Sequence, residues 1–197
     1  MPKWHIVATF VVLIFSGCDL VLSENGLVGP DGEGSTFEVA LLGDWQAQES
    51  RLALTGHEFT SIERKAASSN AYIVTSYRVP KSSKDGEPRK PMAERRSEGE
   101  MYAIRVGKTL FVDCTVPGFE QSHLILRCHN TADELAVSVL NADYFKENRT
   151  AVTCKVGSIV RVTAPRAELL RFLAEHGEND GVWSKPEISK RRHRTAN

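Results

Sequence analysis

The sequence lacks an excess of charge of either sign, since 25 Lys and Arg residues balance 25 Asp and Glu residues among 197. Proteins that bind nucleic acid normally carry a basic surplus, so this balance argues against a nucleic-acid partner. The hydrophobic fraction is 41%, and it falls once the apolar first residues are set aside. Composition therefore indicates an ordinary soluble domain with polar stretches rather than a multispanning membrane protein.

Signatures of common catalytic and cofactor-binding sites are absent as well. The chain has no Gly-x-Ser-x-Gly elbow, no phosphate-binding loop and no dinucleotide fingerprint. His57-Glu58 is not followed by a second histidine four residues later, which excludes the zinc-protease helix. His123 and His129 lie six residues apart, which in a strand is about 20 Å and too far for one metal ion. The sequence therefore predicts no enzyme, no cofactor and no metal site.

The N-terminus carries a short basic start followed by an apolar run. Lys3 precedes Ile6–Phe15, a run of ten residues that as a helix would rise about 15 Å, roughly half of a bilayer's hydrocarbon core. This pattern is typical of a secretory signal peptide. The alternative is a buried helix or strand of the domain itself.

The run ends in Phe15-Ser16-Gly17-Cys18, which resembles the bacterial lipobox. That resemblance implies cleavage after a signal peptide of residues 1–17 and a membrane lipid attached to Cys18. Two or three acyl chains suffice for stable anchoring. The expected location is thus the extracytoplasmic side of a cell membrane, inner or outer, and the alternative is plain secretion.

Composition divides the rest of the chain into three parts. Residues 18–36 are rich in Gly, Ser and acids and are expected to form a flexible tether after the lipidated cysteine. Residues 37–177 are expected to form one β domain. Residues 178–197 are expected to be a disordered tail, because beyond Trp183 five Lys and Arg residues stand against one acid, Glu187, up to Arg194. A mixed-charge segment, Pro80–Gly99, is expected to be a long hairpin loop.

Short β-prone segments separated by turn residues predict a mainly β fold, a single antiparallel barrel or sandwich of about eight strands. Gly107-Lys108 marks a tight hairpin. A C-terminal helix over Pro165–His176 is expected to pack outside the sheet, because its apolar residues form one stripe. A shorter helix is expected over Asn141–Asn148. The predicted strands are Trp45–Gln48, Arg51–Thr55, Tyr72–Val79, Met101–Val106, Thr109–Thr115, His123–Cys128, Glu134–Leu140 and Ser158–Thr163.

One motif suggests a more specific fold. Leu41-Leu42-Gly43-Asp44-Trp45 resembles the Gly-x-Trp start of the lipocalin and wider calycin barrels. In that family the Trp closes one end of the barrel, and an Arg from the last strand packs over it. The resemblance implies a barrel-closing set of Gly43, Trp45 and Arg161. The chain also resembles small bacterial lipoproteins of unknown function that carry such β domains.

Three cysteines remain after Cys18, and export would permit a disulfide among them. Strand alternation places Cys114 and Cys128 on like faces of neighbouring predicted strands. They either form a disulfide or remain two buried core thiols. A Cys128–Cys154 bond is the third alternative.

The leading functional hypothesis is a non-catalytic binding module, anchored by membrane lipid through Cys18, whose partner is a small apolar ligand or an envelope protein. The second hypothesis is a structural accessory of a cell-envelope complex. A secreted enzyme is the third, and it would require His57, His123, His129 or His176 to cluster with carboxylates in one cleft.

Overall fold

The computed structural model describes residues 20–48, 56–67, 69–80, 94–115, 122–157 and 159–192. Cys18, the predicted signal peptide of residues 1–17 and the predicted strand Arg51–Thr55 lie outside the described residues. In the described part, no helix has the length and apolar character needed to cross a membrane.

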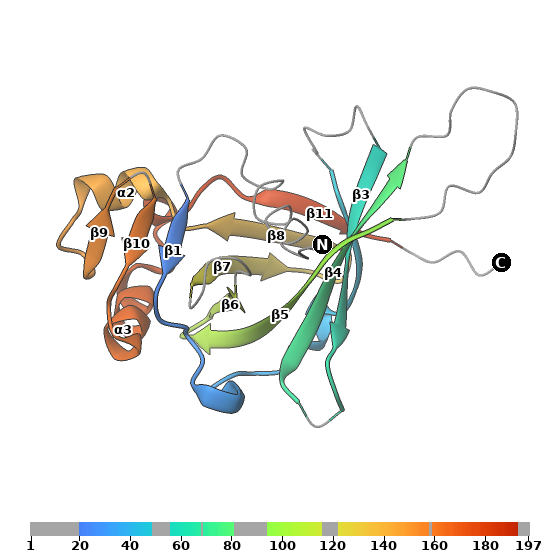
Figure 1. Ribbon diagram of the computed structural model, residues 1–197, viewed down its shortest axis with the longest axis horizontal. Helices are drawn as coiled ribbons and strands as arrows, with labels where there is room; N and C mark the ends of the chain where they lie inside the picture. Colours follow the sequence, from blue (N-terminus) through green and yellow to red (C-terminus); the bar gives the residue numbers. More distant parts are fainter. Residues whose placement is uncertain are drawn as a thin grey trace, which may run out of the picture.

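The fold is a closed barrel of eight antiparallel strands (Figure 1). Seven of the strands follow one another along the chain, each paired with the next, and β11 pairs with both β8 and β2 to close the barrel. The predicted mainly β class with an antiparallel barrel is confirmed. The barrel strands are β2 (Gly43–Ala47), β3 (Gly56–Arg64), β4 (Ala71–Pro80), β5 (Glu94–Val106), β6 (Thr109–Thr115), β7 (His123–Asn130), β8 (Glu134–Val139) and β11 (Glu187–Arg191).

Strand alternation builds two hydrophobic cores, one on each side of the barrel wall. On β6, Leu110 and Val112 belong to the interior cluster, whereas Phe111 between them belongs to a second cluster outside. On β7, Leu124 and Ile125 divide in the same way. Successive side chains of a strand point to opposite faces, so both faces can be apolar only where a second layer covers the outside.

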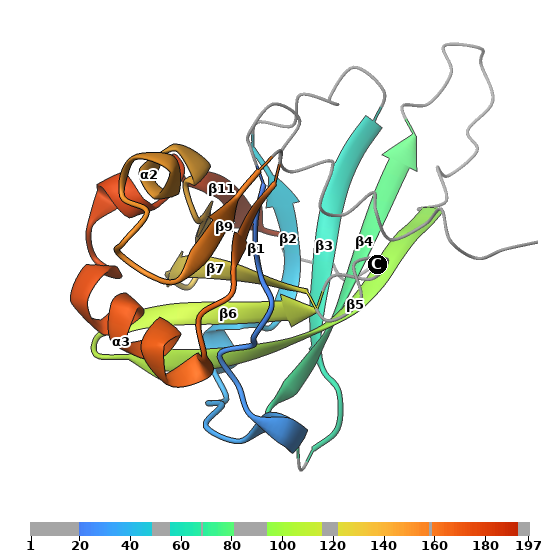
Figure 2. The ribbon, with the colours of Figure 1, turned by 60° about the vertical axis from the view of Figure 1, so that its left-hand side comes forward.

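The second layer consists of short elements from both ends of the chain. A three-stranded sheet orders β1 (Val21–Ser23), β10 (Val160–Val162) and β9 (Cys154–Val156), with β1 parallel to β10. Figure 2 shows these strands side by side, with the two helices next to them. The helices α2 (Ala142–Glu147) and α3 (Arg166–His176) confirm the two predicted helices.

Helix α3 packs outside the barrel as expected. Its buried residues Leu169, Phe172 and Leu173 join Phe111 of β6 and Ile104 of β5 in the outer cluster. The β5–β6 hairpin also forms as predicted, with Val106 opposite Thr109. Three 3-10 turns complete the described elements: η1 (Pro30–Gly32), η2 (Val39–Leu41) and η3 (Asp180–Val182).

One end of the barrel is closed by Trp45 and the segment before it. Trp45 is 1% exposed, and its indole N–H donates to the Leu41 carbonyl at 2.9 Å. Arg191 of β11 lies over the Trp45 ring at 4.3 Å and donates to the carbonyls of Leu42 and Ala40 at 2.5 and 3.0 Å. The arginine over Trp45 is thus Arg191 and not the predicted Arg161, because β11 and not the predicted strand Ser158–Thr163 is the last barrel strand.

Three segment assignments also need correction. The predicted tether contains β1 and the fully buried Leu22 and Leu27. The predicted basic tail contains β11, whose backbone closes the barrel. The region predicted as a long loop contributes residues 94–99 to β5. In the tail and in residues 94–99 most residues are polar, and pairing with neighbouring strands orders them. In the tether, the buried Leu22 and Leu27 fix the segment to the core.

We expect Arg191→Ala to lower the free energy of unfolding by about 2–3 kcal/mol, because it removes charge-assisted hydrogen bonds and the cation–π contact together. Urea unfolding followed by Trp fluorescence measures the change. Lys190→Ala on the same strand is the control: Lys190 is exposed, so its loss is expected to cost less than about 0.5 kcal/mol. Equal effects of the two variants would contradict this account of barrel closure.

Candidate functional site

A groove of about 620 Å³ lies beside the turn of the β5–β6 hairpin. Residues from β5 to β8 and from the segment after α3 line it. Its charged lining residues are Arg105, Lys108, Arg127 and Glu178, and His129 of β7 also lines it. Leu110 and Cys128 are among the lining residues too, but their side chains belong to the cluster inside the barrel. The charged lining of the groove is therefore mainly basic.

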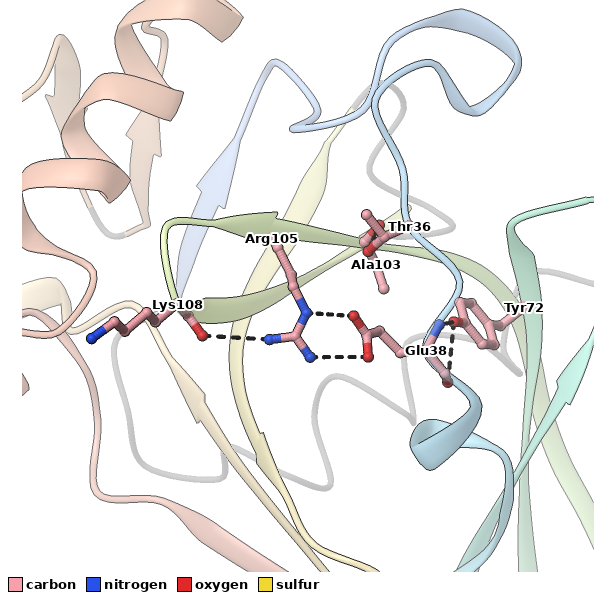
Figure 3. Close-up of polar contacts among 6 residues, drawn as sticks. All are labelled: Thr36, Glu38, Tyr72, Ala103, Arg105 and Lys108. Atoms are coloured by element: carbon pink, nitrogen blue, oxygen red, sulfur yellow. Dashed lines mark hydrogen bonds and ion pairs between the residues drawn. The ribbon is translucent and has the colours of Figure 1, made fainter.

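The hairpin turn sets the position of the first two basic side chains. Gly107 has φ +62°, a left-handed conformation that glycine adopts without steric cost. The turn places the Lys108 carbonyl 3.4 Å from the Arg105 guanidinium, which donates to it (Figure 3). Arg105 also donates to both carboxylate oxygens of Glu38 at 2.5 and 3.0 Å. This bidentate pair fixes the guanidinium plane at the groove edge.

Glu38 is itself held by a tyrosine from inside the barrel. The Tyr72 hydroxyl accepts from the Glu38 backbone N–H at 2.5 Å and donates to the Glu38 carbonyl at 3.3 Å (Figure 3). Burial raises the pKa of Tyr72, so the hydroxyl stays protonated and keeps its donor. The hydrogen bonds that Arg105 donates to the Glu38 carboxylate raise the pKa of Arg105. Hydrogen bonds from Tyr72 to Glu38 and from Arg105 to Glu38 thus connect the barrel interior to the groove.

Arg127 of β7 supplies the third basic side chain. Its guanidinium lies 5.4 Å from the centre of the Trp183 ring and donates to Asp180 at 2.9 Å and to the Gly177 carbonyl at 3.4 Å. The Asp180 side chain is 92% exposed, so this ion pair is screened by solvent and contributes little to stability. The stacking on Trp183, which packs on Phe111 at 5.6 Å, holds the guanidinium in place.

Lys108 has no acidic partner within the described part of the chain. Its ammonium stands at the hairpin turn, whereas Arg105 and Arg127 are each paired with one carboxylate. Glu178 is the acidic residue among those that line the groove. A groove with this charge distribution attracts anions, and its two fixed guanidinium planes suit carboxylate, sulfate or phosphate groups.

A second polar pair lies at the opposite end of β6 and β7. Asp113 is 3% exposed, and its Oδ1 accepts from Nδ1 of His123 at 2.7 Å. Its Oδ2 accepts from the backbone N–H groups of Leu27 and Val28 at 2.7 and 3.4 Å. Both carboxylate oxygens are therefore occupied, and the pair bridges the N-terminal segment to the barrel wall.

Of the four histidines considered for catalysis, the three whose side chains are described are not brought into one cleft. His123 contacts Asp113, His129 is exposed at the groove, and His176 packs on Phe172 at 5.0 Å. The side chain of His57 lies outside the described residues. Among the described residues, no group of three or more His, Cys, Asp or Glu side chains is placed to hold a metal ion.

The predicted cysteine pair is separated by the register of its strands. Cys114 lies opposite Leu124, and Cys128 lies opposite Leu110, so their Cα atoms are about 13 Å apart along the strand direction. A disulfide needs about 4.4–6.8 Å, and Cys114, Cys128 and Cys154 are all free thiols. Of the predicted alternatives, the one in which Cys114 and Cys128 remain two core thiols is correct. Burial raises the pKa of Cys128 to about 12.

Arg161 occupies a different place from the predicted one. It lies on β10 opposite Leu22, on the face of β10 that packs toward the barrel, and donates to the Ser122 hydroxyl at 3.5 Å. Gly43 and Trp45 do stand together at the closed end, and Gly43 has φ +130° with its space filled by Arg191. A Cβ there would lie 2.5 Å from the Arg191 guanidinium.

Sequence reasoning missed Asp113, Glu38 and the basic groove. One signal was present for Asp113: an acid inside the apolar run of β6 must find partners when both faces of the strand are covered. The groove had no such signal, because its basic residues come from two separate segments, the β5–β6 hairpin and β7.

No family model, curated protein or solved structure matches the chain. The function therefore has to be inferred from the geometry of the chain itself.

Folding stability is expected to fall as pH rises past the ordinary histidine range. The hydrogen bond that His123 donates to Asp113 raises the pKa of His123 above its ordinary value of 6.5. A histidine whose pKa is higher in the folded protein than in the unfolded chain stabilises the fold. This stabilisation is fully present at pH values below the pKa of the unfolded chain, and it is lost as the pH rises through the pKa of the folded protein. Urea midpoints at pH 5.5 and 8.5 test this for the native chain and for His123→Gln.

The difference between the native chain and His123→Gln should be larger at pH 5.5 than at pH 8.5. His129→Gln is the control, because His129 is an exposed histidine on the same strand. A gap that is constant with pH, or that widens at high pH, would show that the Asp113–His123 pair does not carry this dependence.

Proposed function

We propose that this protein is a lipoprotein anchored on the extracytoplasmic side of a cell membrane, where its barrel acts as a non-catalytic binding module. The anchor is supported by the basic start, the apolar run and the lipobox-like Phe15–Cys18. The binding role is supported by the basic groove, where two guanidinium groups are held in fixed orientations and Lys108 has no acidic partner among the described residues.

The chemistry of the groove favours an anionic ligand over a purely apolar one. Its three basic side chains outnumber Glu178 in the lining, and both guanidinium planes are oriented before a ligand arrives. Preorganised donors lower the entropy cost of binding.

The interior of the barrel provides less support for a small apolar ligand. Apolar side chains from β2 to β8 pack there into one cluster, which includes Trp45, Tyr72, Met101 and Leu126. Exposed large apolar side chains within the described residues are Val39 and Ile188, which are isolated rather than gathered in a docking patch. The groove is therefore the stronger candidate than a buried cavity or an apolar protein interface.

The anchor is tested by mass spectrometry of the N-terminal peptide from membrane-extracted protein. We expect the mature chain to begin at Cys18 and to carry diacylglycerol on its thiol, with Cys18→Ser leaving the leader uncleaved. An unmodified thiol at position 18 in the purified protein, or native protein that keeps residues 1–17, would overturn the anchor.

The groove is tested with inorganic pyrophosphate as the probe, measured by calorimetry at low ionic strength. We expect binding that Lys108→Gln weakens about two- to fivefold, since one partly exposed charge contributes about that much, and that added salt weakens further. Lys190→Gln, which removes an exposed lysine from β11, should leave the affinity unchanged. Absent binding, or equal affinity in both variants, would contradict an anion-binding groove.

A further inference from the structure

The folded domain begins very close to the predicted anchoring residue. The carbonyl of Leu20 accepts from the Val160 N–H at 3.1 Å, and the Leu20 side chain packs against the barrel cluster. Leu22, two residues further, is fully buried. The first residues after position 19 are thus built into β1 and the barrel core.

The covalent chain limits how far Cys18 lies from this point. Leu20 comes two positions after Cys18 in the sequence. Two steps along a fully extended chain span at most about 7 Å. A free tether of residues 19–35 would instead span about 20–25 Å. A lipid on Cys18 would therefore hold the start of β1 at the depth of the headgroups.

We propose that the end of the domain formed by the start of β1 and the β9–β10 turn docks directly on a lipid surface. This inference rests on the proposed lipidation of Cys18. It assigns the membrane a specific face of the protein, in place of a domain that is held away from the bilayer.

Apolar side chains surround the point of attachment. Val160 is paired with Val21 on one side and with Val156 on the other, so the start of β1 and the β9–β10 turn share one edge. Leu20, Val156 and Ile159 there are all only half-buried. Partly exposed aliphatic side chains at this edge suit the interface between headgroups and acyl chains.

Charge is distributed unequally along these short strands. Lys155 and Arg161 are directly opposite one another, and Lys155 is exposed. The described acids nearest in the chain lie at the other end of the sheet: Glu24 follows β1, and Glu168 accepts from Thr153 before β9. Basic side chains are attracted to an anionic bilayer, and Lys155 and Arg161 together outnumber Asp19, the acid that lies between Cys18 and Leu20 in the sequence.

Fluorescence quenching in vesicles tests the proposed face. The full-length acylated protein is reconstituted in phosphatidylcholine and phosphatidylglycerol vesicles that contain nitroxide-labelled lipid. A fluorophore is placed at Gly157→Cys, in a background with Cys114→Ala and Cys154→Ser, which removes the two half-buried native thiols. Gly157 is exposed, and a Cβ there would meet only the Ile159 carbonyl at 3.7 Å, an ordinary contact. Lys155→Cys is a second probe at the same edge.

The matched control is Val39→Cys, because Val39 is 67% exposed at the closed end of the barrel. We expect quenching at positions 157 and 155 to exceed that at position 39 at least threefold. Acylated protein with equal quenching at all three positions would overturn the docking face and leave the anchor intact. Protein whose Cys18 carries no lipid would overturn both proposals.

Discussion

Pairing of β11 with both β2 and β8 is the constraint on which the rest of this structure depends. Without that strand the sheet would have two open edges, each with unpaired backbone N–H and C=O groups. Closure fixes the direction in which every interior side chain points and defines the two ends of the barrel. Arg191 at the last position of β11 then links closure to the end plug, because it contacts Trp45 and the carbonyls before it.

The outer layer follows from closure and determines where the groove forms. The outside of β5, β6 and β7 is apolar and needs a cover, which α3 and the elements around it provide. The cover ends near Gly177, whose carbonyl accepts from the half-buried Arg127. Lys108 at the hairpin turn is exposed. The groove is therefore a consequence of an outer layer that stops before the end of the barrel wall.

Local chemistry predicted the elements whose signals lie within a few residues. Gly107 marked the hairpin, and the apolar stripe of Leu169, Phe172 and Leu173 marked α3. Strand β3 was missed, because its polar sequence from His57 to Arg64 carries little apolar alternation. Alternation shows on which face of a strand a side chain lies, but it does not give the register between two strands. For this reason the sequence allowed the thiols of Cys114 and Cys128 to meet.

The sequence alone determined the mainly β class, the antiparallel connections and the apolar face of the last helix, because these depend on spacing between near neighbours. Only the tertiary structure decided which strand closes the barrel and which arginine covers Trp45. It also decided that residues 21–23 are part of the fold. Each of these depends on contacts between segments more than a hundred residues apart, such as Val21 with Val160 and Trp45 with Arg191. The sequence of a polar or glycine-rich segment does not reveal the distant strand with which it pairs. Such a segment is ordered by backbone hydrogen bonds that the partner strand supplies.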